Sequence, residues 1–161
     1  MKTLLATLSL FLCACGSIQQ GRTEVHVLPT RNPVYQKQVN ELMVHVLEEF
    51  ANNDLVFFPD YVIYATDSIM NPPGDKQHET IAVCFKQVQK GSKDKPVAIV
   101  ISSKYLGSDS NFLFQVLSHE AGHCSWNLPH TKETVGEVMS PLAGELTPGA
   151  WDRFYNNCKG K

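Results

Sequence analysis

The sequence predicts an α+β fold: a twisted mixed sheet with a long helix packed on it, then a second helix and a C-terminal helix. Two observations predict this class. Short β-rich segments fill the first part of the chain and are interrupted by one long amphipathic helix, whereas helical spacing returns near the C-terminus. The chain has 161 residues, of which 43% are hydrophobic. It therefore suits one domain with a real core, and wholesale disorder is excluded.

The charge of the chain argues against two classes of partner. The formal net charge is −2, and the basic residues are scattered. This gives no electrostatic reason to expect nucleic acid or an anionic membrane surface as a partner. No apolar run reaches the roughly 20 residues that a membrane-spanning helix needs. We expect no nucleic-acid binding and no spanning helix.

The N-terminus is typical of a secretory signal peptide. Lys2 supplies a positive start, and about ten residues rich in Leu and Ala follow, too few to span a membrane. The stretch that ends at Cys15 reads Leu-Cys-Ala-Cys and resembles the bacterial lipobox, in which the signal is cut before the last cysteine. The resemblance implies a lipoprotein signal peptide over residues 1–14, a lipidated tether over residues 15–23 and a single domain over residues 24–161.

In this interpretation Cys15 carries the lipid. Several acyl chains give stable anchoring, whereas a single chain is only marginal. The domain is then expected outside the cytoplasm, in the cell envelope, held to a bacterial membrane through its lipid anchor. Gly16 follows the cysteine, which by resemblance to Gram-negative sorting rules favours the outer membrane. The alternative is an ordinary signal peptide with two incidental cysteines.

The domain is predicted to begin with a strand and a long helix. Residues Glu24–Leu28 alternate and are β-rich. Asn32 followed by Pro33 is an N-cap with proline at the first helical position. Apolar residues then recur at helical spacing to about Asn52, which predicts an amphipathic helix with one face on the sheet.

Four further strands are expected after this helix. They cover Leu55–Phe58, Tyr61–Thr66, Ile81–Val88 and Val97–Ser102, with a Pro- and Gly-rich loop at residues 71–75. Another loop, over residues 107–110, is expected to cap the next helix.

That next helix carries the residues that point to chemistry. His119, Glu120 and His123 form the motif H-E-x-x-H, and apolar residues at helical spacing precede it. Two histidines at i and i+4 project from the same side of a helix, so both imidazoles can bind one Zn²⁺. The glutamate between them lies beside the metal and is placed to accept a proton from a water molecule.

A zinc site of this kind needs a third ligand. His130 stands seven residues after His123 and is the first candidate. A downstream carboxylate, Glu137 or Glu145, is the alternative.

The stretch from His119 to His130 resembles the motif of the metzincin metalloproteases, H-E-x-x-H-x-x-G-x-x-H. The spacing here is one residue longer, and Asn127 replaces the glycine at which the helix turns. Asparagine is the next-best residue for a left-handed helix end. Met139-Ser140-Pro141 is similar to the Met-x-Pro turn of the matrixin branch, in which the methionine lies beneath the metal. The resemblance implies a zincin fold with Met139 in this Met-turn.

The same family ends with a helix behind the turn. Thr147 followed by Pro148 predicts its N-cap and first position. Trp151, Phe154 and Tyr155 have the spacing of its buried face.

The resemblance implies a zinc-dependent endopeptidase in which His119, His123 and His130 hold one catalytic Zn²⁺. Glu120 is the general base, and the partner is a peptide or protein substrate. We expect the protein to be a monomer, and the strand Val97–Ser102 to line the cleft and pair with an extended substrate. The alternative function is a non-catalytic envelope lipoprotein that keeps the zincin fold and acts as a binding or exclusion factor.

The cysteines and the remaining histidines have simpler interpretations. An exported domain meets an oxidising compartment, so Cys84, Cys124 and Cys158 allow one disulfide and leave one thiol. The sequence does not choose the pair, and three buried free thiols is the alternative. His45 falls off the apolar stripe of the first helix and is expected at the surface.

Overall fold

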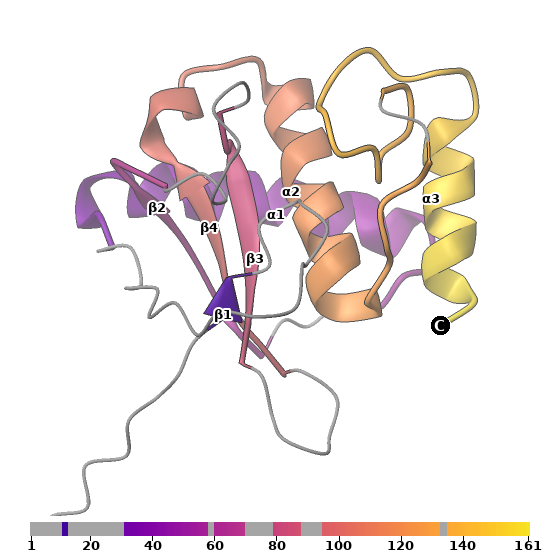
Figure 1. Ribbon diagram of the computed structural model, residues 1–161, viewed down its shortest axis with the longest axis horizontal. Helices are drawn as coiled ribbons and strands as arrows, with labels where there is room; N and C mark the ends of the chain where they lie inside the picture. The colour runs from indigo at the N-terminus through magenta and orange to yellow at the C-terminus, as the bar shows by residue number, and fades with distance from the viewer. Residues whose placement is uncertain (1–10, 13–30, 58–59, 70–78, 88–94, 133–134) are drawn as a thin grey trace, which may run out of the picture.

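The computed structural model describes residues 11–12, 31–57, 60–69, 79–87, 95–132 and 135–161. It is an α+β fold with a small mixed sheet, as the sequence predicts (Figure 1). The elements are β1 (Phe11–Leu12), η1 (Pro33–Tyr35), α1 (Gln36–Asn52), β2 (Val62–Thr66), β3 (Ala82–Gln87), β4 (Lys95–Ser102), η2 (Ser103–Tyr105), α2 (Ser110–Trp126) and α3 (Ala150–Lys159).

The long first helix starts where the sequence predicts. The Asn32 side chain accepts a hydrogen bond from the backbone N–H of Val34, and Pro33 opens the 3-10 turn η1 that leads into α1. The helix ends at Asn52. Its buried residues, Val39, Val46 and Phe50, lie on one face, so α1 packs along that stripe.

The sheet has the strand order β1-β3-β4-β2. β2 runs parallel to β4, whereas β3 runs antiparallel to it with a bulge between Phe85 and Lys86. β1 is two residues long and pairs antiparallel with β3 on its other edge. It lies within the stretch that the sequence predicts as a signal peptide.

Helices cover one face of this sheet. Ala65, Cys84, Ile99 and Ile101 belong to the main core together with buried residues of α1, α2 and α3. The alternate residues of the same strands form a second, smaller apolar cluster on the opposite face: Tyr64, Val83, Phe85, Ala98 and Val100. Figure 1 shows α1 crossing behind α2, and α3 on the side of α2 away from the strands. Aromatic contacts of Phe50 with Phe154 and Tyr155 join α1 to α3.

The structure corrects two strand predictions. Residues 55–57 are not a strand, although Leu55 and Phe57 are buried and Val56 is exposed. The Leu55 N–H is bonded to the carbonyl of Phe50 at the end of α1, so alternation here reflects a linker packed on the core. The predicted strand Val97–Ser102 is present as part of β4, but β4 lies inside the sheet and not at its edge. Because β4 pairs with β2 on one edge and β3 on the other, it has no edge left for a substrate.

The start of the C-terminal helix is also corrected. α3 begins at Ala150 behind Gly149, which has a left-handed backbone with φ of 75°. Thr147 is not its N-cap because both its backbone N–H and its hydroxyl donate to the carbonyl of Gly136. The predicted buried face is present: Phe154 and Tyr155 are buried, and Trp151 packs against the core.

The structure settles the cysteine pairing. Cys84 on β3 is disulfide-bonded to Cys124 on α2, and Cys158 is a buried free thiol. His45 is exposed, as predicted, with its ring against Phe114.

Several predictions lie outside the described residues: the lipid site at Cys15, the tether, the strand Glu24–Leu28 and the loop at residues 71–75. None of the helices in the described part of the chain has the length and apolarity to cross a membrane.

Candidate metal centre

Helix α2 positions the first two histidines. Its N-terminus is capped by Asp109, whose carboxylate accepts from the backbone N–H groups of Asn111 and Phe112. The helix continues without a break through the H-E-x-x-H motif and ends at Asn127. Both His119 and Glu120 are buried, and His123 is half-buried.

Asn127 turns the chain back toward the helix. Its backbone is left-handed, with φ of 51° and ψ of 37°. The N–H groups of Asn127 and Leu128 both donate to the carbonyl of Gly122. The sequence predicts this left-handed end from asparagine standing three residues before His130, and the structure confirms the backbone geometry.

The turn brings the three histidines together. The Nε2 atom of His123 lies 3.0 Å from that of His119 and 3.0 Å from that of His130. The Nε2 atoms of His119 and His130 are 3.3 Å apart. A tetrahedral zinc ion, about 2.0–2.1 Å from each nitrogen, separates its ligands by about 3.3 Å. The three imidazoles therefore fit one metal ion, and they form a group able to hold one.

Backbone carbonyls fix the two helical rings. Nδ1 of His119 donates to the carbonyl of Val138, and Nδ1 of His123 donates to that of Leu128, each over 2.7 Å. A proton on Nδ1 leaves Nε2 with its lone pair free for a metal. No sequence motif marks a carbonyl group, so sequence reasoning missed these two partners.

Burial and mutual repulsion favour the neutral form of the three imidazole rings. Burial lowers the pKa of His119 to about 3 and that of His123 to about 4, with repulsion from the neighbouring imidazoles as a further cause. Burial also lowers the pKa of His130. Neutral imidazole is the form that binds metal, so these rings need not lose a proton before a metal ion binds.

Glu120 lies beside the histidines but outside the ligand set. Its Oε1 atom is 4.0 Å from Nε2 of His119. Burial raises its pKa to about 8, and a backbone hydrogen bond from Cys84 and the charge of Lys86 act in the opposite direction. A carboxyl group this close to His119, and outside the group of residues that could hold a metal, can exchange a proton with a molecule bound there.

Both carboxylate alternatives for the third ligand lie elsewhere. Glu137 is paired with Arg153, with Oε1 2.6 Å from Nη2, and also accepts from the Thr147 hydroxyl. Glu145 is exposed. Neither belongs to the group of residues that could hold a metal.

Met139 lies in a tight turn against α2. The Ser140 N–H donates to the carbonyl of Glu137, and the Ser140 hydroxyl accepts from the Glu137 N–H. Met139 is buried, and its sulfur packs on Gly122. The same turn contains Val138, whose carbonyl accepts from His119, so the turn helps to orient this imidazole ring.

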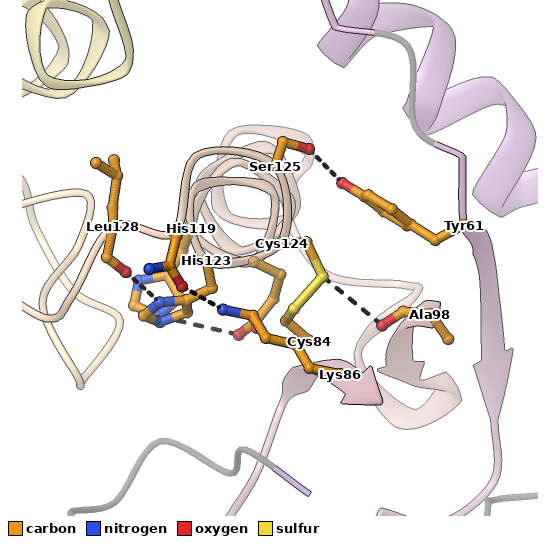
Figure 2. Close-up of a disulfide and its surroundings, with 11 residues drawn as sticks. Tyr61, Cys84, Lys86, Ala98, His119, His123, Cys124, Ser125 and Leu128 are labelled. Carbon is orange, nitrogen blue, oxygen red and sulfur yellow. Dashed lines mark hydrogen bonds and ion pairs between the residues drawn. A yellow bond between two sulfur atoms is a disulfide. The ribbon is translucent and has the colours of Figure 1, made fainter. Parts of the chain in front are cut away.

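Figure 2 shows how β3 meets this helix. The disulfide joins Cys84 to Cys124, next to His123, while Lys86 reaches toward the histidine side of α2. On the opposite side of the helix, the Tyr61 hydroxyl and Ser125 form a hydrogen bond of 2.7 Å. The motif helix is thus joined to β3 on one side and to Tyr61, the residue before β2, on the other. From the sequence, Cys124 is predicted to be a disulfide or packing residue. No sequence motif indicates that Lys86 lies near the histidines.

Comparisons with known proteins add no identity: no protein-family model, curated protein or solved structure matches this chain.

Proposed function

We propose that this protein is a zinc-dependent endopeptidase of metzincin-like type, anchored in the cell envelope by lipid at Cys15. One observation carries the proposal. Three imidazole Nε2 atoms converge at the spacing of a tetrahedral metal, and a buried carboxylate that is not a ligand lies beside them. Three protein ligands leave a fourth position open, which distinguishes catalytic zinc sites from structural ones.

The chain supplies the residues for peptide hydrolysis. His119, His123 and His130 would hold the metal. When bound, zinc lowers the pKa of a water molecule, polarises a carbonyl group and favours the ionised form of a neighbouring carboxylate. Glu120 would then accept the proton of the attacking water and pass it to the leaving amine, because its carboxylate lies beside His119 without belonging to the ligands.

An edge of the sheet supports an extended peptide as substrate. At Phe85 and Lys86, β3 pairs antiparallel with the two-residue strand β1. This edge of β3 can therefore bind a partner strand through its backbone groups. That partner, Phe11–Leu12, belongs to the predicted signal peptide. With residues 1–14 removed, a substrate would take its place by adding a strand to β3. This replaces β4 as the strand expected to bind substrate.

The test is a comparison of two glutamate variants. Glu120→Gln should retain one zinc per chain, because the ligands are histidines, and should lose about 10²–10⁴-fold in peptide hydrolysis. Glu145→Gln, on the exposed surface, is the matched control and should change neither. Zinc content is measured by elemental analysis, and activity with a mixed peptide library.

The outcome also distinguishes the endopeptidase from the alternative function, a non-catalytic lipoprotein. A wild-type protein that binds zinc but cleaves no peptide would favour the non-catalytic lipoprotein. Loss of zinc in Glu120→Gln would make Glu120 a ligand and contradict the mechanism.

A further inference from the structure

A lysine side chain lies beside the turn that connects two histidines of the metal centre. Lys86 and Cys84 are two residues apart on β3, and both are joined to α2. Cys84 makes the disulfide to Cys124 (Figure 2). Nζ of Lys86 donates to Oδ1 of Asn127, the residue that caps the C-terminus of α2, over 2.9 Å. Lys86 is partly buried. Its ammonium group is therefore held where the chain turns from His123 toward His130.

Lys86 forms no ion pair with a carboxylate within the described part of the chain. Five other cationic side chains form ion pairs with carboxylates: Lys37, Lys95, Lys104, Arg153 and Lys159. Among the described residues, the hydrogen-bond partner of Lys86 is a neutral group, the side-chain amide of Asn127. An ammonium group has three N–H donors, and one amide oxygen uses one of them.

The ammonium group also lies within electrostatic reach of the reacting groups. Burial is the main cause of the pKa shifts of Glu120 and His123, but the charge of Lys86 lowers both. In addition, Lys86 is one of the two β3 residues that pair with β1. A peptide that took the place of β1 would pass directly over it.

We propose that Lys86 binds a carboxylate group of the substrate close to the scissile bond, so that the enzyme selects peptides with an acidic group there. The inference rests on the proposed function. The carboxylate has two sources, an Asp or Glu side chain or the α-carboxylate of a peptide's C-terminus. A charge-assisted hydrogen bond of this kind corresponds to about 10- to 100-fold in kcat/KM.

The experiment uses paired peptide libraries on the zinc-loaded mature protein, from which residues 1–14 have been removed. One pair differs by Glu against Gln at each position around the cleaved bond, and a second pair by a free C-terminal carboxylate against an amide. The wild type should prefer the acidic member of one pair by about 10- to 100-fold, and which pair shows it identifies the source. Lys86→Met should abolish the preference, Lys86→Glu should reverse it toward Lys-containing peptides, and Lys37→Met on α1 is the matched control.

Two results would overturn the proposal. If Lys86→Met lowers kcat/KM equally for acidic and amide peptides, Lys86 only supports Asn127. If the preference survives in Lys86→Met, the carboxylate is bound elsewhere.

A binding measurement keeps this test separate from the proposed function. The zinc-loaded Glu120→Gln protein is titrated with labelled Glu and Gln peptides, with and without Lys86→Met. If the wild type cleaves no peptide, the proposed function fails. A Lys86-dependent preference for the Glu peptide would still support carboxylate binding, and equal affinities would overturn it.

Discussion

The sulfur of Met139 packs directly on the backbone of Gly122, the residue before His123. A Cβ atom at Gly122 would lie 2.6 Å from Sδ of Met139 and 3.1 Å from the ring of Phe154. Glycine inside a helix costs about 1 kcal/mol relative to alanine, so close packing explains its presence here. The residue before Met139 in this turn is Val138, whose carbonyl accepts a hydrogen bond from His119. The contact therefore links the turn, the helix and His119, a candidate metal ligand.

Gly122→Ala should disturb both stability and metal binding. The added methyl group must displace the buried Met139 side chain, and overpacking of this kind costs about 1–3 kcal/mol. The better helix propensity of alanine offsets about 1 kcal/mol of this. We expect a net loss of up to about 2 kcal/mol in the free energy of unfolding of the metal-free protein, measured by urea denaturation, and weaker zinc binding.

Gly107→Ala is the control for this prediction, because no atom lies within 4 Å of a Cβ built there. It should leave the free energy of unfolding within about 0.5 kcal/mol of the wild type. A Gly122→Ala protein that is as stable as wild type and binds zinc equally well would show that Met139 does not constrain the helix.

The metal centre has a simple test of its third ligand. His130→Ala should lose zinc as completely as His123→Ala, since both contribute one of the three converging Nε2 atoms. Glu137→Gln should keep it, because that carboxylate is engaged with Arg153. Zinc retained in His130→Ala but lost in Glu137→Gln would exclude the three-histidine site.

Local sequence signals predicted most of what positions this site. Asn32-Pro33 marked the start of the first helix, and H-E-x-x-H with His130 marked the residues that converge. Asn127 marked the left-handed end because few residues tolerate that backbone. The predicted strand Leu55–Phe58 is absent over residues 55–57, and the Thr147 cap was wrong. In both cases the backbone N–H bonds to a carbonyl outside the predicted element, that of Phe50 for Leu55 and that of Gly136 for Thr147. The disulfide partner and the carbonyls that orient the imidazoles depend on tertiary packing, which no short motif encodes.

The Cys84–Cys124 disulfide should stabilise the fold and help to hold the Glu120 side chain in position. It closes a loop with a sequence separation of 40 residues, which corresponds to about 4 kcal/mol in the chain-entropy account. Replacing both cysteines with alanine should lower the free energy of unfolding by about 2–4 kcal/mol. Because the backbone of Cys84 is hydrogen-bonded to Glu120, hydrolysis should fall more than zinc affinity.

Peptide mapping without reduction checks the pairing itself. We expect a linked Cys84–Cys124 peptide, and Cys158 that is alkylated only after unfolding, since burial raises the pKa of its thiol to about 12. A peptide that links Cys158 to either partner would contradict the structure.

The Glu137–Arg153 pair should give a pH-dependent contribution to stability. Hydrogen bonds from Arg153, together with that from Thr147, hold the pKa of Glu137 below its usual value of 4.5. A lowered carboxyl pKa stabilises the fold above the unfolded-state value, and this contribution is lost as the pH falls through the folded-state value. At pH 7, Glu137→Gln should cost up to about 1 kcal/mol, as surface pairs do.

The difference between Glu137→Gln and wild type should therefore shrink as the pH falls below 4.5. Denaturation midpoints at a series of pH values measure it, with Glu145→Gln as the exposed control. A difference that stays constant down to acid pH would mean that the side-chain shape, and not the charge, matters.

Asn127 allows the most direct test of how the chain reaches the third ligand. Its φ of 51° is open to glycine but strongly disfavoured for a β-branched residue. Asn127→Gly loses only the contact with Lys86 and should keep zinc affinity within a few-fold. Asn127→Val must strain the backbone by about 1–3 kcal/mol or straighten the turn. Straightening would carry His130 away from His119 and His123. We therefore expect zinc affinity at least about 10-fold weaker in Asn127→Val than in Asn127→Gly, measured by competition with a chelator. Equal affinities would show that His130 reaches the metal without the left-handed turn.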